Sequence, residues 1–171
     1  MRHNTKSGFT LIELMVTIVV ISILIGVARY GVGTALARSR NEERRVDTTN
    51  LAMHLDSAYI SGFSGLGGLK GRYPSTQHAT TSGVEALFRG IDTKNLKAPG
   101  STGEHSIAMA TNGTQTPDGV RPIPTETTYV YQPINSAGGL CTSTSQECRK
   151  FNIFYKLENN LTIQKITSKN Q

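Results

Sequence analysis

Glu13 is the only charged residue in the stretch FTLIELMVTIVVISILIGVA, which covers positions 9–28. A carboxylate inside a membrane-spanning segment is energetically costly, so such residues usually have a partner or a role. Cleavage between Gly8 and Phe9 supplies a partner, because it places a new α-amine at the start of the apolar run. A neighbouring copy displaced by about one helical turn brings its Phe9 amine to Glu13, and the two charges neutralise each other among apolar helices. Glu13 is therefore interpreted as an assembly device that sets the register between subunits.

The apolar run has the length of a transmembrane helix, since about 20 helical residues cover the roughly 30 Å of a hydrocarbon core. The preceding leader, MRHNTKSG, carries Arg2 and Lys6 and no acidic residue. The positive-inside rule therefore places the leader in the cytoplasm and the rest of the chain outside. An ordinary secretory signal competes, because residues 35–37 (ALA) match a cleavage site, but the run is too long and Arg29 intervenes. A plain single-span anchor fits the length but leaves Glu13 without a partner.

The stretch KSGFTLIELMVTIVVISIL, residues 6–24, resembles the prepilin leader and class III signal of type IV pilins and pseudopilins. A glycine followed by FTLIE and an unbroken apolar run is specific in this predicted context. The resemblance covers residue 2 to about residue 60, and the remainder resembles the family only in outline. It implies that a prepilin peptidase cleaves after Gly8 and that Phe9 becomes N-methylated. It also implies that Glu13 guides subunit docking and promotes the methylation.

The resemblance further implies partners and a location. The partners are other pilin subunits in a homo- or hetero-polymer, a prepilin peptidase, a pilus assembly ATPase, a polytopic platform protein and the membrane itself. Before assembly the chain is expected to be a single-pass protein of the inner (cytoplasmic) membrane, with a cytoplasmic leader and an external head. After assembly it is expected in an extracellular pilus or pseudopilus.

Cys141 and Cys148 are the two cysteines of the chain, and the residues between them are polar. Their spacing is not C-x-x-C, which disfavours a zinc site and a thioredoxin-like redox site. In a protein exported across a membrane the pair predicts a disulfide that closes a small loop. The chain-entropy stabilisation of so short a loop is roughly 2.5 kcal/mol. Two free thiols are the alternative in a reducing compartment.

No other group of residues has the spacing of a known catalytic or metal site. His54, His78 and His105 are scattered along the chain without metal-ligand spacing to one another. The sequence has no nucleophile-elbow, phosphate-loop or zinc-protease motif, so we predict neither an enzyme nor a bound cofactor or metal. The sequons at Asn112 (NGT) and Asn160 (NLT) are short enough to occur by chance, and the first also reads as a turn.

The net charge of +6 is a mild basic bias, and Arg2 and Lys6 of the leader contribute two of these charges. A dedicated nucleic-acid-binding protein usually has a denser basic stripe with aromatic residues nearby. The composition therefore disfavours direct nucleic-acid binding. A pilus subunit that captures DNA during uptake is kept as a narrower alternative.

We predict an α+β, pilin-like fold, in which a long N-terminal α-helix packs on a small C-terminal antiparallel β-sheet head. No proline occurs before Pro74, so one helix can run from residue 9 to about residue 60, a length of roughly 78 Å. Four segments follow from this: a cleaved leader, a transmembrane and assembly half of the helix, an amphipathic half and a globular head, at residues 1–8, 9–28, 29–60 and 61–171.

The amphipathic half of the helix has one apolar face with Leu51 and Leu55 at helical spacing, which is expected to pack against the head. The mixed charges of residues 38–47 are interpreted as a solvated face, and contact with the next subunit is an alternative that can coexist with it. Glycines at positions 26, 31 and 33 permit either local melting in a filament or close helix packing in the membrane. Both interpretations stay open at the level of sequence.

The head is predicted to begin at a glycine-rich break, residues 62–71. A short helix is predicted at residues 83–89 with Ser82 as its cap. Residues 95–127 are rich in Pro, Gly, Ser and Thr, and they predict a long surface loop with a short strand at residues 106–110.

Three segments with alternating apolar and polar residues predict β-strands, at residues 128–134, 151–157 and 161–166. The last two are joined by residues 158–160 (ENN), which is a hairpin signal. Pro133 pushes the first strand toward a sheet edge or an early end. The expected product is a small antiparallel sheet with one face on the helix, and the Cys141–Cys148 loop lies between the first strand and the hairpin.

Together these features predict a structural subunit of a type IV pilus or pseudopilus filament, processed after Gly8 and polymerised through its N-terminal helix. A protein of another class is retained as the alternative, namely a monomeric single-span membrane-anchored extracellular binding domain. Major and minor subunits share the N-terminal signal, so the sequence does not choose among adhesion, motility, DNA uptake and secretion.

Overall fold

The computed structural model describes residues 8–160 and 162–170. The predicted leader therefore lies outside the described residues except for Gly8, as does Leu161, the predicted first residue of the last strand. The chain divides after Arg38 into two units, and we call the second one, residues 39–171, the head unit. The four segment limits predicted from the sequence stay predictions.

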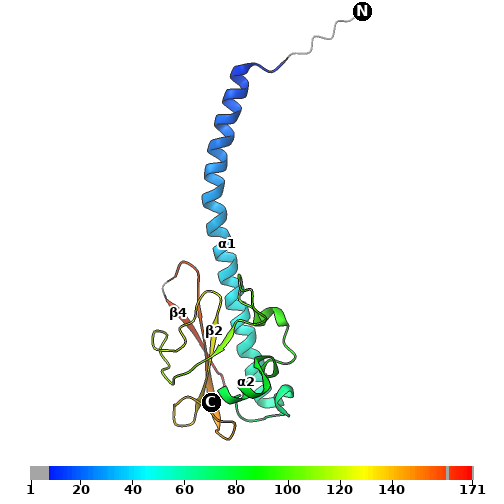
Figure 1. Cartoon of the computed structure of the whole chain (residues 1–171), viewed down its shortest axis with the longest axis vertical. Coiled ribbons are helices and arrows are strands. Elements are labelled where there is room, and N and C mark those ends of the chain that lie inside the picture. Colours follow the sequence, from blue (N-terminus) through cyan, green and yellow to red (C-terminus); the bar gives the residue numbers. More distant parts are fainter. Residues whose placement is uncertain (1–7, 161, 171) are drawn as a thin grey trace, which may run out of the picture. The chain divides into compact units, whose positions relative to one another are not determined.

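The first element is α1 (Leu11–Ser61), an α-helix of 51 residues (Figure 1). The helix predicted from residue 9 to about residue 60 is thus confirmed apart from its first two residues. It ends where Gly62 takes a φ of 104°, a conformation that side-chain-bearing residues rarely adopt. Among the described residues, α1 is the one helix long and apolar enough to cross a membrane.

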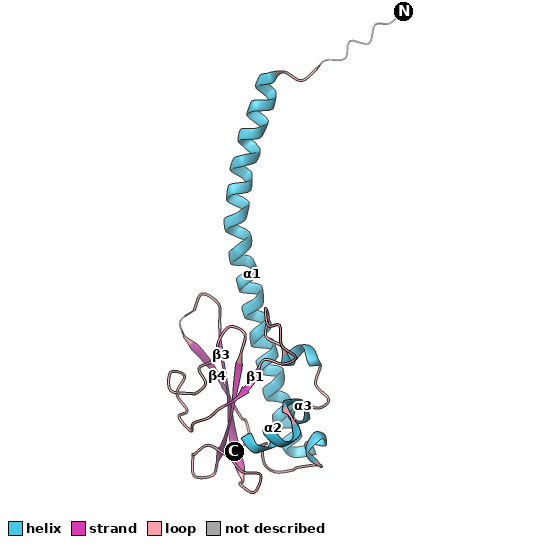
Figure 2. Cartoon of the chain, viewed as in Figure 1, coloured by secondary structure: helices cyan, strands magenta, loops and turns pink. Residues whose placement is uncertain are grey.

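Short helices connect α1 to the sheet, namely η1 (Ser64–Leu66), α2 (Thr76–Ser82), α3 (Val84–Leu87) and η2 (Thr93–Leu96) (Figure 2). The prediction of a single helix at residues 83–89 is wrong in its limits. Ser82, its predicted cap, is the last residue of α2, and Gly83 with a φ of 82° separates α2 from α3. α2 was not predicted, because His78 takes the place of the usual Glu or Gln in a capping box with Ser75.

The sheet of the head unit has the strand order β1-β2-β3-β4, with β1 (Ile107–Met109), β2 (Tyr129–Asn135), β3 (Cys148–Lys156) and β4 (Ile163–Thr167). The pairs β2–β3 and β3–β4 are antiparallel, as predicted. β1 is parallel to β2, so the sheet is mixed, and the all-antiparallel prediction is wrong for this strand. The long segment between β1 and β2 makes this possible, because it can return the chain to the same end of the sheet.

Pro133 lies in an inner strand although proline cannot donate to a strand ladder. β1 accompanies β2 only as far as the pair Met109–Tyr131. Beyond that point β2 keeps β3 as its strand neighbour, with Pro133 opposite Phe151. On its other side this end of β2 is paired with the returning chain, since Ile134 forms an antiparallel bridge with Leu140 and the Cys141 N–H donates to the Pro133 carbonyl at 2.9 Å. The predicted edge position of Pro133 is therefore wrong, and its missing N–H lies where β1 has already ended.

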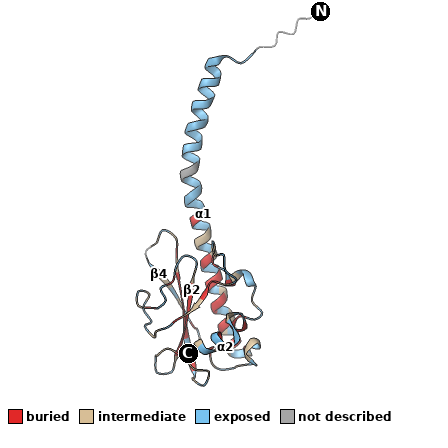
Figure 3. Ribbon diagram, viewed as in Figure 1, coloured by how far each residue is buried: buried red, intermediate tan, exposed pale blue. Residues whose placement is uncertain are grey.

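The main core lies between the head part of α1 and one face of the sheet (Figure 3). Leu51 and Leu55 are buried at 1% and 0% exposure, which confirms the predicted packing face of the helix. Tyr73 and Phe151 belong to the same cluster, and their rings meet edge-to-face with centroids 4.8 Å apart. Hydrophobic packing of the head part of α1 against the sheet therefore forms the main core of the head unit.

A smaller core covers the opposite face of the sheet, and its members are Ala110, Val120, Val130 and Phe154. Gln132 is fully buried on this face. Its Nε2 donates to the carbonyl oxygens of Asn112 and Thr114 at 2.8 and 3.0 Å. The segment after β1, predicted as a long surface loop, is therefore fastened onto the sheet.

Candidate assembly site at the start of α1

Glu13 lies in the first turn of α1, where its carboxylate caps the helix. The Thr10 N–H donates to Glu13 Oε2 at 3.0 Å, and the Thr10 hydroxyl donates to the same oxygen at 2.9 Å. The Glu13 N–H in turn donates to Thr10 Oγ1 at 3.3 Å. This reciprocal pattern is a capping box with Thr10 as the N-cap. It holds the carboxylate at the helix end whose partial positive charge favours an anion.

This local role of Glu13 was not predicted from the sequence, where its expected partner was the amine of a neighbouring copy. The signal was present, because Thr10 and Glu13 have the T-x-x-E spacing of a capping box. The capping bonds engage Oε2. Within the part of the chain that the structure describes, Oε1 makes no hydrogen bond, so one oxygen remains able to accept a further donor.

Apart from the nearby hydroxyls of Thr10 and Thr17, the helix surface around Glu13 is apolar, and it is exposed. Phe9 is 83% exposed, and large apolar side chains continue along the helix at Leu11, Ile12, Leu14, Met15, Val16, Ile18, Val19, Val20, Ile21, Ile23, Leu24 and Ile25. No residue in the most apolar stretch of α1, all of it within the described residues, is buried by the chain itself. A helix that is apolar all round needs lipid or other apolar helices to cover it.

Gly8 and Phe9 precede the first turn of α1, and both are exposed. The family model described as "Prokaryotic N-terminal methylation motif" matches residues 3–28, a segment that contains Gly8, Phe9 and Glu13. The chain carries the class III prepilin signal of type IV pilins and pseudopilins. This motif indicates a type IV pilin-like or pseudopilin precursor. No curated protein and no solved structure matches the chain.

The pilin-like head contains the predicted disulfide between Cys141 and Cys148, with an S–S distance of 1.98 Å and a Cα–Cα distance of 5.7 Å. It closes the segment between β2 and β3, as expected from the sequence. The N–H of Tyr73 donates to the Cys148 carbonyl at 2.9 Å, and the N–H of Thr76 donates to the Cys141 carbonyl at 3.1 Å. Both ends of the closed loop are therefore bonded to the chain that leads into α2.

Arg44 in α1 is buried with 1% exposure, so the predicted solvated face is wrong at this position. Its Nη2 donates to Glu158 Oε1 at 2.7 Å. Arg40 donates to both oxygens of the same carboxylate through Nε and Nη2, at 2.7 and 2.6 Å. These hydrogen bonds, that of Arg40 foremost, lower the pKa of Glu158 to about 2. The turn after β3 covers Arg44. This contact could not be predicted from the charge pattern of the helix, because Glu158 lies far away in the sequence.

Asp47 is the second charged residue of the predicted solvated face that the head buries, at 3% exposure. Its Oδ2 accepts the Tyr129 hydroxyl at 3.2 Å. Burial raises the pKa of Asp47 to about 6, although its hydrogen bond from Tyr129 works in the opposite direction. Asp47 is therefore a poorly compensated buried carboxylate at neutral pH.

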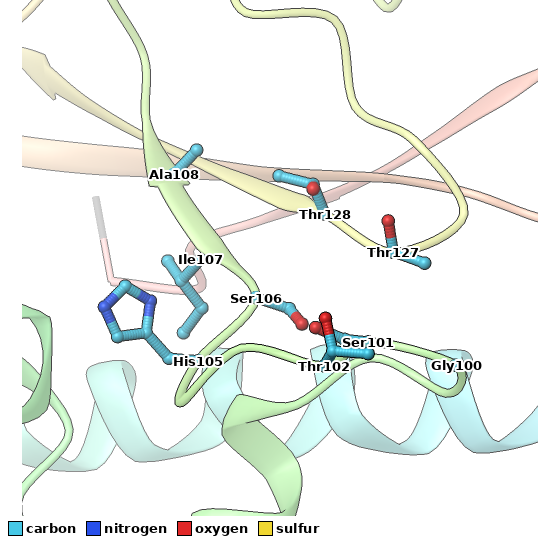
Figure 4. A pocket seen from close by; sticks show the side chains of 9 residues that line it. All are labelled: Gly100, Ser101, Thr102, His105, Ser106, Ile107, Ala108, Thr127 and Thr128. Carbon is cyan, nitrogen blue, oxygen red and sulfur yellow. The ribbon is translucent and has the colours of Figure 1, made fainter.

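A cavity of about 270 Å³ lies in the head unit beside β1 and is lined by Gly100, Ser101, Thr102, His105, Ser106, Ile107, Ala108, Thr127 and Thr128. The hydroxyls of Ser101, Thr102 and Ser106 gather on one side, whereas the His105 ring points away from them (Figure 4). Among the described residues, no carboxylate, lysine or arginine lines this cavity. Across the described residues, no group of three or more His, Cys, Asp or Glu side chains is arranged to hold a metal ion.

Proposed function

We propose that this chain is a structural subunit of a type IV pilus or pseudopilus, stored in the membrane through residues 9–28 and polymerised through its N-terminal helix. The observation that carries the proposal is the methylation motif at residues 3–28, which falls on a helix whose apolar surface the chain leaves uncovered. Such a surface is stable in lipid and equally stable against other apolar helices. The same residues can therefore serve storage before assembly and packing afterwards.

Processing creates the charge that the assembly uses. A prepilin peptidase cleaves between Gly8 and Phe9, and the new amine of Phe9 is methylated. The exposure of both residues, and their position before the first helical turn, support access to this bond. The methylated amine keeps its positive charge, because alkylation of an amine does not remove its ability to bind a proton.

In the filament, the Phe9 amine of one subunit pairs with Glu13 of its neighbour. The free Oε1 of Glu13 supports this pairing, since the capping bonds with Thr10 engage only Oε2. The desolvation of both ions offsets much of their attraction, so the pair acts mainly by fixing the axial register of the two helices.

The remaining partners act from the membrane and the cytoplasm. An assembly ATPase and a polytopic platform protein extract the subunit and add it to the filament base. The basic leader with Arg2 and Lys6 stays in the cytoplasm, and the head lies outside. The Cys141–Cys148 disulfide supports this orientation, because disulfides persist in oxidising compartments.

Mass spectrometry of the mature N-terminus tests the processing step. The protein recovered from surface filaments should begin at Phe9 and carry the mass of one added methyl group. A protein with an intact leader that never leaves the membrane fraction would instead support the monomeric anchored domain.

Variants of Glu13 test the assembly step. Glu13→Gln keeps the size and part of the capping geometry but removes the charge, and Glu13→Ala removes both. Each variant should insert into the membrane normally and yield few filaments. Thr17→Ala, a change on the same apolar segment, is the matched control and should leave filament yield near that of the wild type. Undiminished filaments from Glu13→Gln would remove the proposed charge pairing.

A further inference from the structure

The head unit contains two sequons, at Asn112 and Asn160, and the structure presents their amides differently. A sequon is the acceptor signal for N-linked glycosylation, which joins a sugar to the side-chain nitrogen of the asparagine. That nitrogen must be unbonded and accessible for the transfer. The hydrogen bonds of the two asparagines therefore decide which of them can react in the folded head.

Asn160 lies in the turn between β3 and β4 and is half-buried, as Asn112 is, next to the exposed Asn159, whose φ is 58°. Asn160 Oδ1 accepts the Thr162 N–H at 2.9 Å and the Thr162 hydroxyl at 2.5 Å. Within the described residues, Asn160 Nδ2 donates no hydrogen bond. The turn thus brings the threonine hydroxyl onto the amide oxygen, and the amide nitrogen has no hydrogen bond to another described residue.

Asn112 has the opposite arrangement. Its Nδ2 donates to the Gly119 carbonyl at 2.8 Å, and its Oδ1 accepts the Arg121 N–H at 3.0 Å. The following residue is also confined, because a Cβ built on Gly113 would lie 3.0 Å from the Leu140 nitrogen. This sequon is therefore bonded at both ends of its amide and packed against a neighbouring segment.

We propose that Asn160 is an N-glycosylation site and that Asn112 is not. The donor is an oligosaccharide on a polyprenyl pyrophosphate, used by a membrane oligosaccharyltransferase on the outer side. Asn160 Nδ2 attacks the anomeric carbon, a C–N bond forms, and the C–O bond to the pyrophosphate breaks. The polyprenyl pyrophosphate leaves with the bonding electron pair, one amide proton passes to the enzyme, and no oxidant is needed. The site rests on the proposed function in one respect, because it requires the head to lie outside.

Peptide mass spectrometry of the full chain, purified from the cells that make it, tests this inference. The peptide with Asn160 should carry a glycan mass, and the peptide with Asn112 should be unmodified. Thr162→Ala should abolish the modification, whereas Thr162→Ser, which restores a hydroxyl, should retain it. Thr114→Ala destroys the other sequon without changing Asn112, and it should leave the glycan pattern unchanged. Circular dichroism of each variant checks that the head is folded.

The two proposals fail separately in this experiment, because the same digest reports the N-terminal residue. A chain that begins at methylated Phe9 but carries a bare Asn160 overturns the glycosylation site and leaves the proposed function standing. Sugar on Asn112 overturns the inference that the folded head selects the acceptor. Sugar that persists in a folded Thr162→Ala variant overturns the assignment to this sequon.

Discussion

Arg44 Nη2 lies 2.7 Å from Glu158 Oε1, although 114 residues separate the two in the chain. The same guanidinium donates through Nε to the Glu126 carbonyl at 2.7 Å and through Nη2 to the Pro99 carbonyl at 3.3 Å. Three segments that are distant in sequence therefore meet at one buried cation of α1. A buried ion pair of this kind adds little net stability over apolar packing, but removing one partner leaves the other as an unpaired buried charge.

Glu158→Gln should destabilise the head because it leaves the buried Arg44 without its anion. We expect the free energy of unfolding at pH 7 to fall by about 1–3 kcal/mol, less than for a fully buried pair because the carboxylate keeps some contact with water. Urea unfolding followed by circular dichroism measures this. Glu147→Gln is the matched control, since it removes a surface pair with Arg149 in which both side chains are over 40% exposed. An equal loss in both variants would contradict the buried role of Arg44.

The effect of Glu158→Gln should depend on pH in a defined direction. Glu158 has a pKa of about 2 in the folded chain, below its ordinary value of 4.5. The stability it contributes is therefore complete above its unfolded-state pKa and is lost as the pH falls toward 2. Urea unfolding curves measured at intervals between pH 7 and pH 2 give the free energy of unfolding of both proteins. The difference between wild type and variant should shrink toward the acidic end. A gap that stays constant down to pH 2 would rule out the carboxylate as the source of the difference.

The features that the sequence predicted correctly have local signals. The helical spacing of Leu51 and Leu55 predicts the packing face of α1, and the pair Cys141–Cys148 predicts a loop closed on itself. The hairpin of β3 and β4 follows from two alternating segments and a short polar turn. Each of these depends on residues that are neighbours in the chain, so the pattern contains the information.

The features that the sequence did not predict depend on distant contacts. The parallel pairing of β1 depends on where a long segment takes the chain, and the segment itself has no pattern that fixes this. The burial of Arg44 and Asp47 depends on partners more than 80 residues away, Glu158 and Tyr129. At the candidate assembly site, Gly8, Phe9 and Glu13 belong to one contiguous motif that the family model covers, and their roles in processing and assembly stay predictions. Its capping by Thr10 was overlooked although its spacing was visible.

Asp47→Asn should stabilise the head at alkaline pH. The folded-state pKa of Asp47 is about 6, above its ordinary value of 3.8, so folding favours the protonated acid. The contribution of Asp47 to folding stability is most favourable below pH 3.8 and is lost as the pH rises through 6. Asparagine can still accept the Tyr129 hydroxyl and carries no charge, so we expect a gain of about 1–3 kcal/mol at pH 8 and almost none at pH 4. Thermal unfolding at the two pH values measures the gain.

The control for Asp47→Asn is Glu42→Gln, which neutralises an exposed carboxylate of the same helix. It should change the unfolding temperature little at either pH, because exposed ion pairs contribute little. If Asp47→Asn destabilised the head at pH 8, the carboxylate would have to make a favourable contact that outweighs the desolvation cost of its buried charge.

Removal of the disulfide should lower stability through the unfolded state. Cys141→Ser together with Cys148→Ser frees the unfolded chain from a closed loop, with an expected loss of roughly 2–3 kcal/mol. Reduction of the wild type should produce a similar loss, and the same reductant should have no further effect on the double variant. Urea unfolding with and without reductant measures both. A double variant as stable as the oxidised wild type would show that the bonds from Tyr73 and Thr76 to this loop suffice to order it.

Thr10→Val should loosen the start of α1 without changing its apolar surface, because valine matches threonine in shape and lacks the hydroxyl. The variant loses the two hydrogen bonds made through Oγ1 and keeps the backbone bond from Thr10 to Glu13. Loss of an N-cap costs about 1 kcal/mol, so amide exchange in the first turn should quicken by roughly fivefold. Hydrogen–deuterium exchange of the full chain in detergent micelles measures this. Thr10→Ser should restore the wild-type rate, and Thr17→Val, whose hydroxyl donates to the Leu14 carbonyl at 2.8 Å, should leave the first turn unchanged. Unaltered exchange in Thr10→Val would mean that lipid or detergent, rather than the capping box, orders the helix end that carries Glu13.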